Sequence, residues 1–119
     1  MDTHSTVATL QEKGLSNDQS FTTEAELTDA TRLFNQQHQA RGGKTALEIK
    51  RAVVMLLDGD MSDNCQIVEF ANSNQAEEYT KYYIATRDEY SAYVIAQEGP
   101  YIVLTTLKVV LETVPLTFN

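Results

Sequence analysis

The last thirty residues of the chain, 90–119, are much less charged than the rest of the sequence. Only Glu98, Lys108 and Glu112 are charged there, and Tyr, Val, Ile, Leu and Thr dominate. These residue types are typical of β-strands packed against a core. An apolar sheet needs cover on at least one face, so the more polar N-terminal part of the chain has to supply it.

Two β-strands are predicted within this stretch. Gly99 and Pro100 interrupt the apolar run in the way that a turn does, which places the strands at about residues 90–97 and 101–107. Apolar residues go on alternating with polar ones beyond the second strand, so strand character is expected to persist to Thr113. A strand at this end of the chain would have a free backbone edge to which another chain could add.

The first predicted helix covers residues 24–41. Thr23 and Glu26 have the spacing of a capping box, in which each side chain accepts a hydrogen bond from the other residue's backbone amide. Apolar residues then recur with helical spacing, so one side of the helix can lie on a sheet. Gly42 and Gly43 follow, and a glycine after the last turn is a common helix end.

A second helix is predicted over residues 46–57, because another capping box begins at Thr45 and apolar residues again recur with helical spacing. Asp58 and Gly59 would end it. Residues 52–57, with the sequence AVVMLL, also suit a buried strand, and this alternative stays open. If the helix forms, it makes a helical hairpin with the first one.

Residues 66–71 alternate in a way that predicts a short strand. Asn74 then has the position of a helix cap, which predicts a third helix over residues 75–86. The tyrosines of this helix continue at helical spacing past its expected end. One long helix over residues 74–97, in place of a helix and a strand, is therefore the alternative interpretation.

Residues 1–22 are rich in Ser, Thr, Gln and Asp, which is typical of a polar N-terminal arm. Residues 23–119 then form a single domain, since no internal repeat or linker divides them. The predicted class is α+β, with two to three helices packed on a small, mainly antiparallel sheet that the C-terminal strands largely form.

The chain has 17 acidic and 9 basic residues and a formal net charge of −8. An acidic surface repels nucleic acid and anionic membranes, so direct binding to either is not expected. The charge favours solubility, or a protein partner with a basic surface. The start of the chain lacks the features of a signal peptide, and no stretch is apolar enough to span a membrane. A cytoplasmic location, in the encoding cell or in a host, is therefore expected.

Few residues are suited to catalysis. Cys65 is the single cysteine, which excludes an intrachain disulfide and a cysteine-based metal cluster. The two histidines, His4 and His38, have no spacing that pairs them with it. We therefore expect no enzyme activity, no catalytic residues and no cofactor, and we expect Cys65 to be a packing residue.

Residues 58–69 have oxygen-bearing side chains at positions 1, 3, 5, 7, 9 and 12 of a twelve-residue stretch. This spacing resembles the calcium-binding loop of EF-hand proteins, although Asp63 stands where that loop needs glycine and Cys65 where an aliphatic residue packs. An acidic surface turn explains the same residues by conformational preference alone. The alternative function is thus a single-site calcium-binding protein with the ligands Asp58, Asp60, Ser62, Asn64 and Glu69.

All six tyrosines lie within 23 positions, between residues 79 and 101. Tyrosine is common at protein interfaces because it offers a large, stiff and amphipathic side chain. Tyrosines are also common at the boundary of a core, with the ring inside and the hydroxyl in water. The functional interpretation predicts an aromatic and acidic contact face for a partner protein, formed by Tyr79, Tyr82, Tyr83, Glu77, Glu78 and Asp88.

The leading hypothesis is a small, acidic, non-enzymatic protein–protein interaction module, such as an inhibitor, an immunity-type protein or a virion assembly component. Its partner would be a protein with a basic surface or another copy of the chain. The calcium-binding protein is the alternative. A third hypothesis is a small-molecule enzyme or sensor that uses a pocket between the helices and the sheet, and no residue in the sequence marks that pocket.

Overall fold

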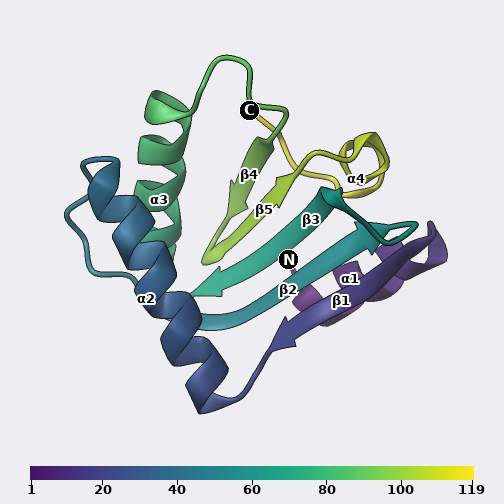
Figure 1. The fold of residues 1–119 in the computed structure, drawn as a ribbon, viewed down its shortest axis with the longest axis horizontal. Coiled ribbons are helices and arrows are strands. Elements are labelled where there is room, and N and C mark those ends of the chain that lie inside the picture. Colours follow the sequence, from purple (N-terminus) through teal and green to yellow (C-terminus); the bar gives the residue numbers. More distant parts are fainter.

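Five strands form one antiparallel sheet in the computed structural model, which describes all residues 1–119 (Figure 1). The strands are β1 (Leu15–Phe21), β2 (Ile49–Leu57), β3 (Asp60–Phe70), β4 (Val94–Glu98) and β5 (Tyr101–Thr105). Their order across the sheet is β1-β2-β3-β5-β4, and each strand is antiparallel to its neighbours.

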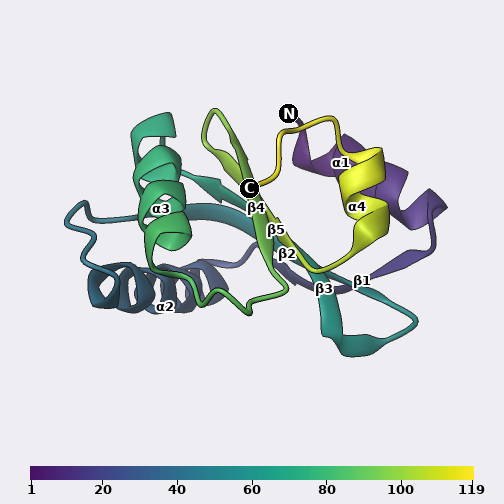
Figure 2. The same ribbon diagram turned by 90° about the horizontal axis from the view of Figure 1, so that it is seen from above.

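Four helices cover both faces of this sheet. They are α1 (Thr3–Glu12), α2 (Glu24–Ala40), α3 (Ser73–Thr86) and α4 (Lys108–Thr113). Figure 2 shows α2 and α3 on one side of the sheet and α1 and α4 on the other. The α+β class is thus confirmed, and the sheet includes the C-terminal strands β4 and β5. None of the four helices has the length and apolar character that a membrane crossing requires.

Side chains alternate along each strand, so the sheet separates two apolar cores. The α2/α3 core contains Ala30, Leu47, Ile49, Ala52, Val68, Phe70, Ala76, Tyr79, Tyr83, Ile95, Ile102 and Leu104. The α1/α4 core contains Leu10, Leu15, Val53, Met55, Cys65, Ile67, Val103, Leu107, Val110 and Val114. The consecutive apolar residues 52–57 of β2 alternate between the two faces, so this part of the strand has no polar face, whereas Lys50 and Arg51 before it are exposed.

Helix α2 forms where the sequence predicts it. The Thr23 side chain accepts a hydrogen bond from the Glu26 amide, and the Glu26 carboxylate accepts one from the Thr23 amide, so the capping box is complete. At the other end the chain turns at Gly42, whose φ of +93° lies in the left-handed region that favours glycine. Arg41, the C-cap residue, therefore has a backbone position fixed by the helix end.

The predicted helix over residues 46–57 is wrong, because most of this segment forms strand β2. Asp58 and Gly59 have φ values of +55° and +70°, as the two central residues of a type I′ hairpin turn do. That turn pairs β2 with β3, and the β-branched Val53 and Val54 suit a sheet. The strand alternative is confirmed, and no helical hairpin forms.

Helix α3 begins two residues before the predicted third helix and ends at Thr86, as expected. Its cap is Asn72 rather than Asn74, since the Asn72 side chain accepts a hydrogen bond from the Gln75 amide. A loop and strand β4 follow the helix. The alternative of one long helix over residues 74–97 is therefore wrong.

The other predicted strands are present with shifted ends. Residues 66–71 fall mostly in the second half of the longer β3, and residues 90–97 and 101–107 correspond to β4 and β5. Gly99 has a φ of +56° in the turn between these last two strands. The turn that the sequence predicts at this glycine is confirmed.

Strand character does not continue to Thr113, so this prediction is wrong. The Thr105 hydroxyl accepts a hydrogen bond from the Leu107 amide, and helix α4 follows. Leu107, Val110 and Val114 recur at i, i+3 and i+7, and all three are buried in the α1/α4 core. The free strand edge expected at this end of the chain is therefore absent.

Residues 1–22 are not a polar arm, because they form α1 and the edge strand β1. The Asp2 side chain caps α1 by accepting a hydrogen bond from the His4 amide. Leu10 and Leu15 are buried in the α1/α4 core, and β1 is hydrogen-bonded to β2. The few apolar residues of this polar segment are enough to attach it to the sheet.

Candidate functional site

A pocket with a volume of about 510 Å³ lies between α2, α3 and the sheet. In Figure 1, α2 and α3 lie over the end of the sheet at which β3 ends, and the β2–β3 hairpin extends beyond them. Ala30 on α2 and Ala52 on β2 are small, so they leave space that larger residues would fill. The lining consists of Phe21, Asp29, Ala30, Leu33, Phe34, Gln37, Arg41, Ala52, Val53, Val54, Gln66, Val68, Tyr79, Tyr83, Tyr93 and Leu104.

Most of this lining is apolar, and several of its side chains are aromatic. Phe34 of α2 packs against Tyr79 of α3 with their ring centroids 5.3 Å apart, and Tyr79 stacks on Tyr83 at 6.1 Å. Such contacts hold the rings in defined positions. Leu33 lines the pocket and is 47% exposed. The pocket therefore has a firm apolar wall and opens to solvent beside Leu33.

Arg41 is the one basic residue that lines the pocket. Its guanidinium lies over the Tyr83 ring, with the Cζ atom 4.3 Å from the ring centroid. The side chain takes part in none of the ion pairs of the chain, and its Nη1 atom is buried without a hydrogen-bond partner. Leaving a buried donor without an acceptor costs about 1–3 kcal/mol, and more for a charged group. The pocket thus contains a positive charge that has no ion-pair partner within the chain.

The two tyrosines beside Arg41 are neutral at physiological pH. Burial raises the pKa of Tyr79 to about 12, and the charge of Arg41 opposes this rise. Burial is also the main reason why the pKa of Tyr83 is raised. Both phenols therefore keep their protons and do not neutralise Arg41.

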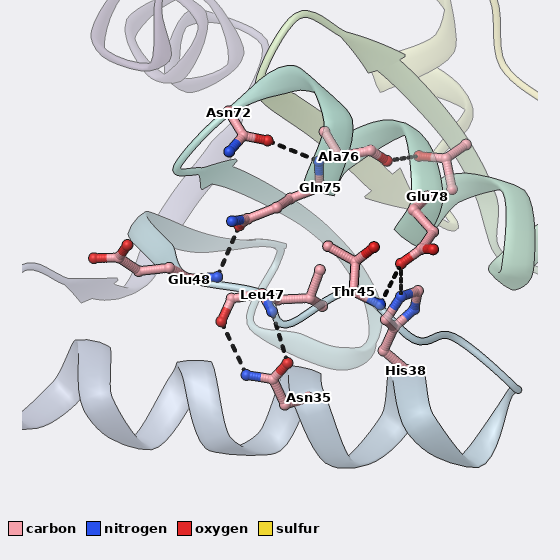
Figure 3. Close-up of polar contacts among 10 residues, drawn as sticks. Asn35, His38, Thr45, Leu47, Glu48, Asn72, Gln75, Ala76 and Glu78 are labelled. Carbon is pink, nitrogen blue, oxygen red and sulfur yellow. Dashed lines mark hydrogen bonds and ion pairs between the residues drawn. The ribbon is translucent and has the colours of Figure 1, made fainter.

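The segment that follows Arg41 is held between α2 and α3 by side chains (Figure 3). The Asn35 side chain accepts a hydrogen bond from the Leu47 amide at 2.8 Å and donates one to the Leu47 carbonyl at 2.9 Å. The Gln75 side chain accepts one from the Glu48 amide at 2.8 Å. These bonds satisfy backbone groups that lie outside the sheet, so they fix α2 relative to α3.

His38 belongs to this polar network and has no exposed surface. Its Nε2 atom lies 2.8 Å from Glu78 Oε2, which also accepts a hydrogen bond from the Thr45 amide at 2.9 Å (Figure 3). The hydrogen bond with His38 is the largest cause, and together with that from Thr45 it holds the pKa of the Glu78 carboxyl below its usual value. Gly43 is so close to the imidazole that a Cβ atom there would overlap the ring. His38 and Glu78 therefore connect α2 to α3 and do not line the pocket.

The tyrosines of the predicted partner face do not point to solvent together. Tyr79 and Tyr83 are only 2% and 6% exposed, and both line the pocket. Tyr82 is half-buried, with its ring edge-on to His38 at a centroid distance of 5.6 Å. The aromatic part of this face is thus largely used in packing.

The acidic residues of the same predicted face are also separated. Glu78 is half-buried and bound to His38, whereas Glu77 and Asp88 are exposed. The exposed tyrosine of this region is Tyr90, at 88%, which the sequence prediction did not select. Binding to a protein with a basic surface, or to another copy of the chain, stays a prediction.

The residues of the predicted calcium loop lie along a hairpin strand. Asp58 is in the turn, and Asp60 accepts hydrogen bonds from the backbone and hydroxyl of Ser62, which lower the pKa of Asp60. Asn64 is buried and donates to the Tyr93 hydroxyl at 2.7 Å. At about 3.3 Å per residue, the far end of β3 is roughly 30 Å from Asp60. The structure does not gather these oxygens around one point, and it holds no group of three or more His, Cys, Asp or Glu residues suited to a metal ion.

Cys65 lies on the opposite side of the sheet from the pocket, in the α1/α4 core. It has no exposed surface, and burial raises the pKa of its thiol to about 12. A thiol with this pKa is almost wholly protonated at neutral pH and is a poor nucleophile. Cys65 packs within the core, as the sequence suggests.

Sequence reasoning did not select Arg41. In the sequence it stands between a helix and two glycines, where a basic residue usually interacts with the helix C-terminus and solvent. The tyrosine cluster was the available signal, because two of its rings lie beside Arg41 in the folded chain. That placement depends on the packing of α2 against α3, which no local pattern predicts.

Comparisons of this chain with protein-family models, with curated proteins and with solved structures found no match. No relative therefore transfers a function or a site residue to it. The pocket and the side chains around it are the observations from which a function can be inferred.

Proposed function

We propose that this chain is a non-catalytic ligand-binding domain whose pocket between α2, α3 and the sheet takes up a small apolar molecule. The supporting observation is the pocket itself, with a volume of about 510 Å³ and a mainly apolar and aromatic lining. Pockets for small molecules commonly have volumes of about 300–1,000 Å³ and linings of this kind.

The energetics of apolar surface favour an occupant. Phe21, Phe34 and Tyr93 line the pocket and are half-buried, so part of each ring stays exposed when the pocket is empty. Removing apolar surface from water contributes about 25 cal/mol for each Å². An apolar ligand would gain this contribution without any rearrangement of the sheet.

The placement of the reactive side chains favours binding over catalysis. His38 is enclosed in the contact between α2 and α3, and Cys65 lies in the core on the other face of the sheet. The pocket offers Arg41, two glutamine side chains, neutral tyrosines and the exposed carboxylate of Asp29 as its main polar groups. Such groups orient a ligand but supply no nucleophile with an adjacent base.

Fluorescence of N-phenyl-1-naphthylamine, an uncharged dye that emits more strongly in apolar surroundings, tests this proposal. Val54 lies on β2 and lines the pocket, and a strand position accepts an aromatic residue well. Val54→Phe should therefore fill part of the pocket while the sheet is retained. We expect saturable binding to the wild type and an affinity at least roughly tenfold lower for Val54→Phe, which corresponds to about 1.4 kcal/mol.

Arg51→Phe is the matched control, because Arg51 is on the same strand, is exposed and does not line this pocket. It should bind the dye as the wild type does. Circular dichroism and thermal unfolding establish that both variants fold. Equal binding by the wild type and Val54→Phe, or no binding by the wild type, would contradict the proposal.

A further inference from the structure

We propose that the ligand of this pocket is a monocarboxylic acid with an apolar body, and that Arg41 binds its carboxylate. This inference rests on the proposed function, since it names the chemical class of ligand for the same pocket. Its basis is the unpartnered guanidinium described above, which lies at one end of an otherwise mainly apolar lining.

Arg41 differs from the other arginine and lysine residues of the chain in having a buried donor without a partner. With 17 acidic residues available, the side chain of Arg41 forms no ion pair, and its buried Nη1 atom has no acceptor. Guanidinium groups present several donors in one plane, which matches the two oxygens of a carboxylate. A carboxylate bound to the guanidinium would neutralise its charge.

The surroundings of Arg41 fix its position. Its backbone is the C-cap of α2, where a positive charge interacts favourably with the helix C-terminus. The guanidinium rests on the Tyr83 ring with its Cζ atom 4.3 Å from the centroid, which covers one face of the group. Nη1 is buried, so a ligand would bind the other N–H donors of the guanidinium. A group held in this way loses little conformational entropy on binding.

The distribution of charge within the pocket also sets the orientation of the ligand. Asp29 is the one acidic residue in the lining, and it is 12 positions before Arg41 on α2, about 18 Å away along the helix axis. Its side chain is 74% exposed and lies 3.7 Å from Arg32. Asp29 is thus offset by Arg32 and screened by solvent, and Arg41 is the group in the lining that attracts a carboxylate. The apolar body would then lie on the apolar residues that the sheet contributes to the lining.

The single positive charge limits the class of ligand. A phosphate or a dicarboxylate has more charge than one arginine neutralises, and the remaining lining is too apolar to accept the excess. An uncharged apolar molecule leaves the charge of Arg41 without a counter-ion. A single carboxylate on an apolar body satisfies both conditions.

Three compounds with the same ten-carbon chain and different head groups test this inference: decanoate, 1-decanol and decyltrimethylammonium. Displacement of N-phenyl-1-naphthylamine from the wild type is measured for each compound, at concentrations below its solubility limit and below any concentration at which it forms micelles. We expect decanoate to bind roughly tenfold or more tightly than 1-decanol, and decyltrimethylammonium to bind more weakly than either. Arg41→Met should remove the preference for decanoate and leave the affinity for 1-decanol nearly unchanged. Arg41→Lys should retain part of it, because the charge remains while the planar donor group is lost.

Arg32→Met is the control for the loss of one positive charge on the same helix, since Arg32 is exposed and does not line the pocket. It should keep the preference for decanoate. Equal affinities of the wild type for decanoate and 1-decanol would overturn the inference and leave the proposed function intact, because the pocket would still bind apolar molecules. If neither decanoate nor 1-decanol displaces the dye, both this inference and the proposed function are overturned. If Arg41→Met does not fold, the inference is decided by the affinities of the wild type for decanoate and 1-decanol.

Discussion

Glu78 connects three segments of the chain through one carboxylate. Its Oε2 atom contacts the imidazole of His38 on α2 and the backbone amide of Thr45 in the loop before β2. The sequence gives no sign of this role, because His38 and Glu78 are 40 positions apart and each resembles an ordinary polar residue of a helix. The packing of α2 against α3 brings them together.

We predict that Glu78→Gln removes a pH-dependent part of the stability. The pKa of Glu78 in the folded protein is below its ordinary value of 4.5, so folding favours the carboxylate over the carboxylic acid. This stabilisation is fully present above pH 4.5 and is lost as the pH falls through the lowered pKa of the folded state. Urea unfolding from about pH 7 to about pH 3 should show the free energy of the wild type falling toward that of Glu78→Gln.

Glu77→Gln is the control for this measurement. Glu77 precedes Glu78 on α3, but it is exposed and lies outside the network with His38. Its free energy of unfolding should follow that of the wild type at each pH. A difference between the wild type and Glu78→Gln that does not change with pH would contradict the prediction.

Among the helices and strands, local signals predict some elements well and others poorly. The capping box at Thr23 acts within three positions, and α2 forms as expected. The apolar residues of β2 fit a helix and a strand equally well. The turn at Asp58 and Gly59 and the pairing with β3 decide in favour of the sheet. Strand pairing is a long-range interaction, so the pattern within one segment does not settle it.

The start of α3 offers a test of a helix cap. Asn72→Ala is expected to lower the free energy of unfolding by about 1 kcal/mol, because the Asn72 side chain accepts the hydrogen bond of the Gln75 amide. Asn74→Ala is the matched control, since Asn74 is exposed in the first turn of the same helix and is not its cap. Urea unfolding of both variants measures the difference. A larger loss for Asn74→Ala would mean that the helix begins where the sequence predicts.

At the scale of the whole molecule, the sheet has a separate apolar core on each face. The uninterrupted apolar run in β2 is a sequence signal for a strand covered on both faces, but it does not say which helices cover it. The pocket could not be predicted, because it depends on how α2 and α3 are placed over the sheet. Arg41 becomes distinctive only because Tyr83, far along the chain, lies under its guanidinium.

The buried thiol of Cys65 gives a test of the core on the far face from the pocket. Cys65 has no exposed surface, and burial raises its pKa to about 12. We predict that 5,5′-dithiobis(2-nitrobenzoic acid) reacts with the folded protein at neutral pH at least roughly 10³-fold more slowly than with the chain unfolded in urea. Absorbance of the released thionitrobenzoate measures both rates. A rate near that of the unfolded chain would contradict the burial of Cys65.

The labelling rate of this single thiol also reports on ligand binding in the pocket on the other side of the sheet. The reagent and a pocket ligand do not compete for space, since the sheet lies between them. A ligand that binds only the folded state lowers the population of unfolded molecules, in which Cys65 is accessible. It therefore slows the labelling of Cys65 by the factor 1 + [L]/Kd. Occupancy of the pocket can thus be measured from the rate of a covalent reaction at Cys65, without attaching a reporter to any residue that the ligand touches.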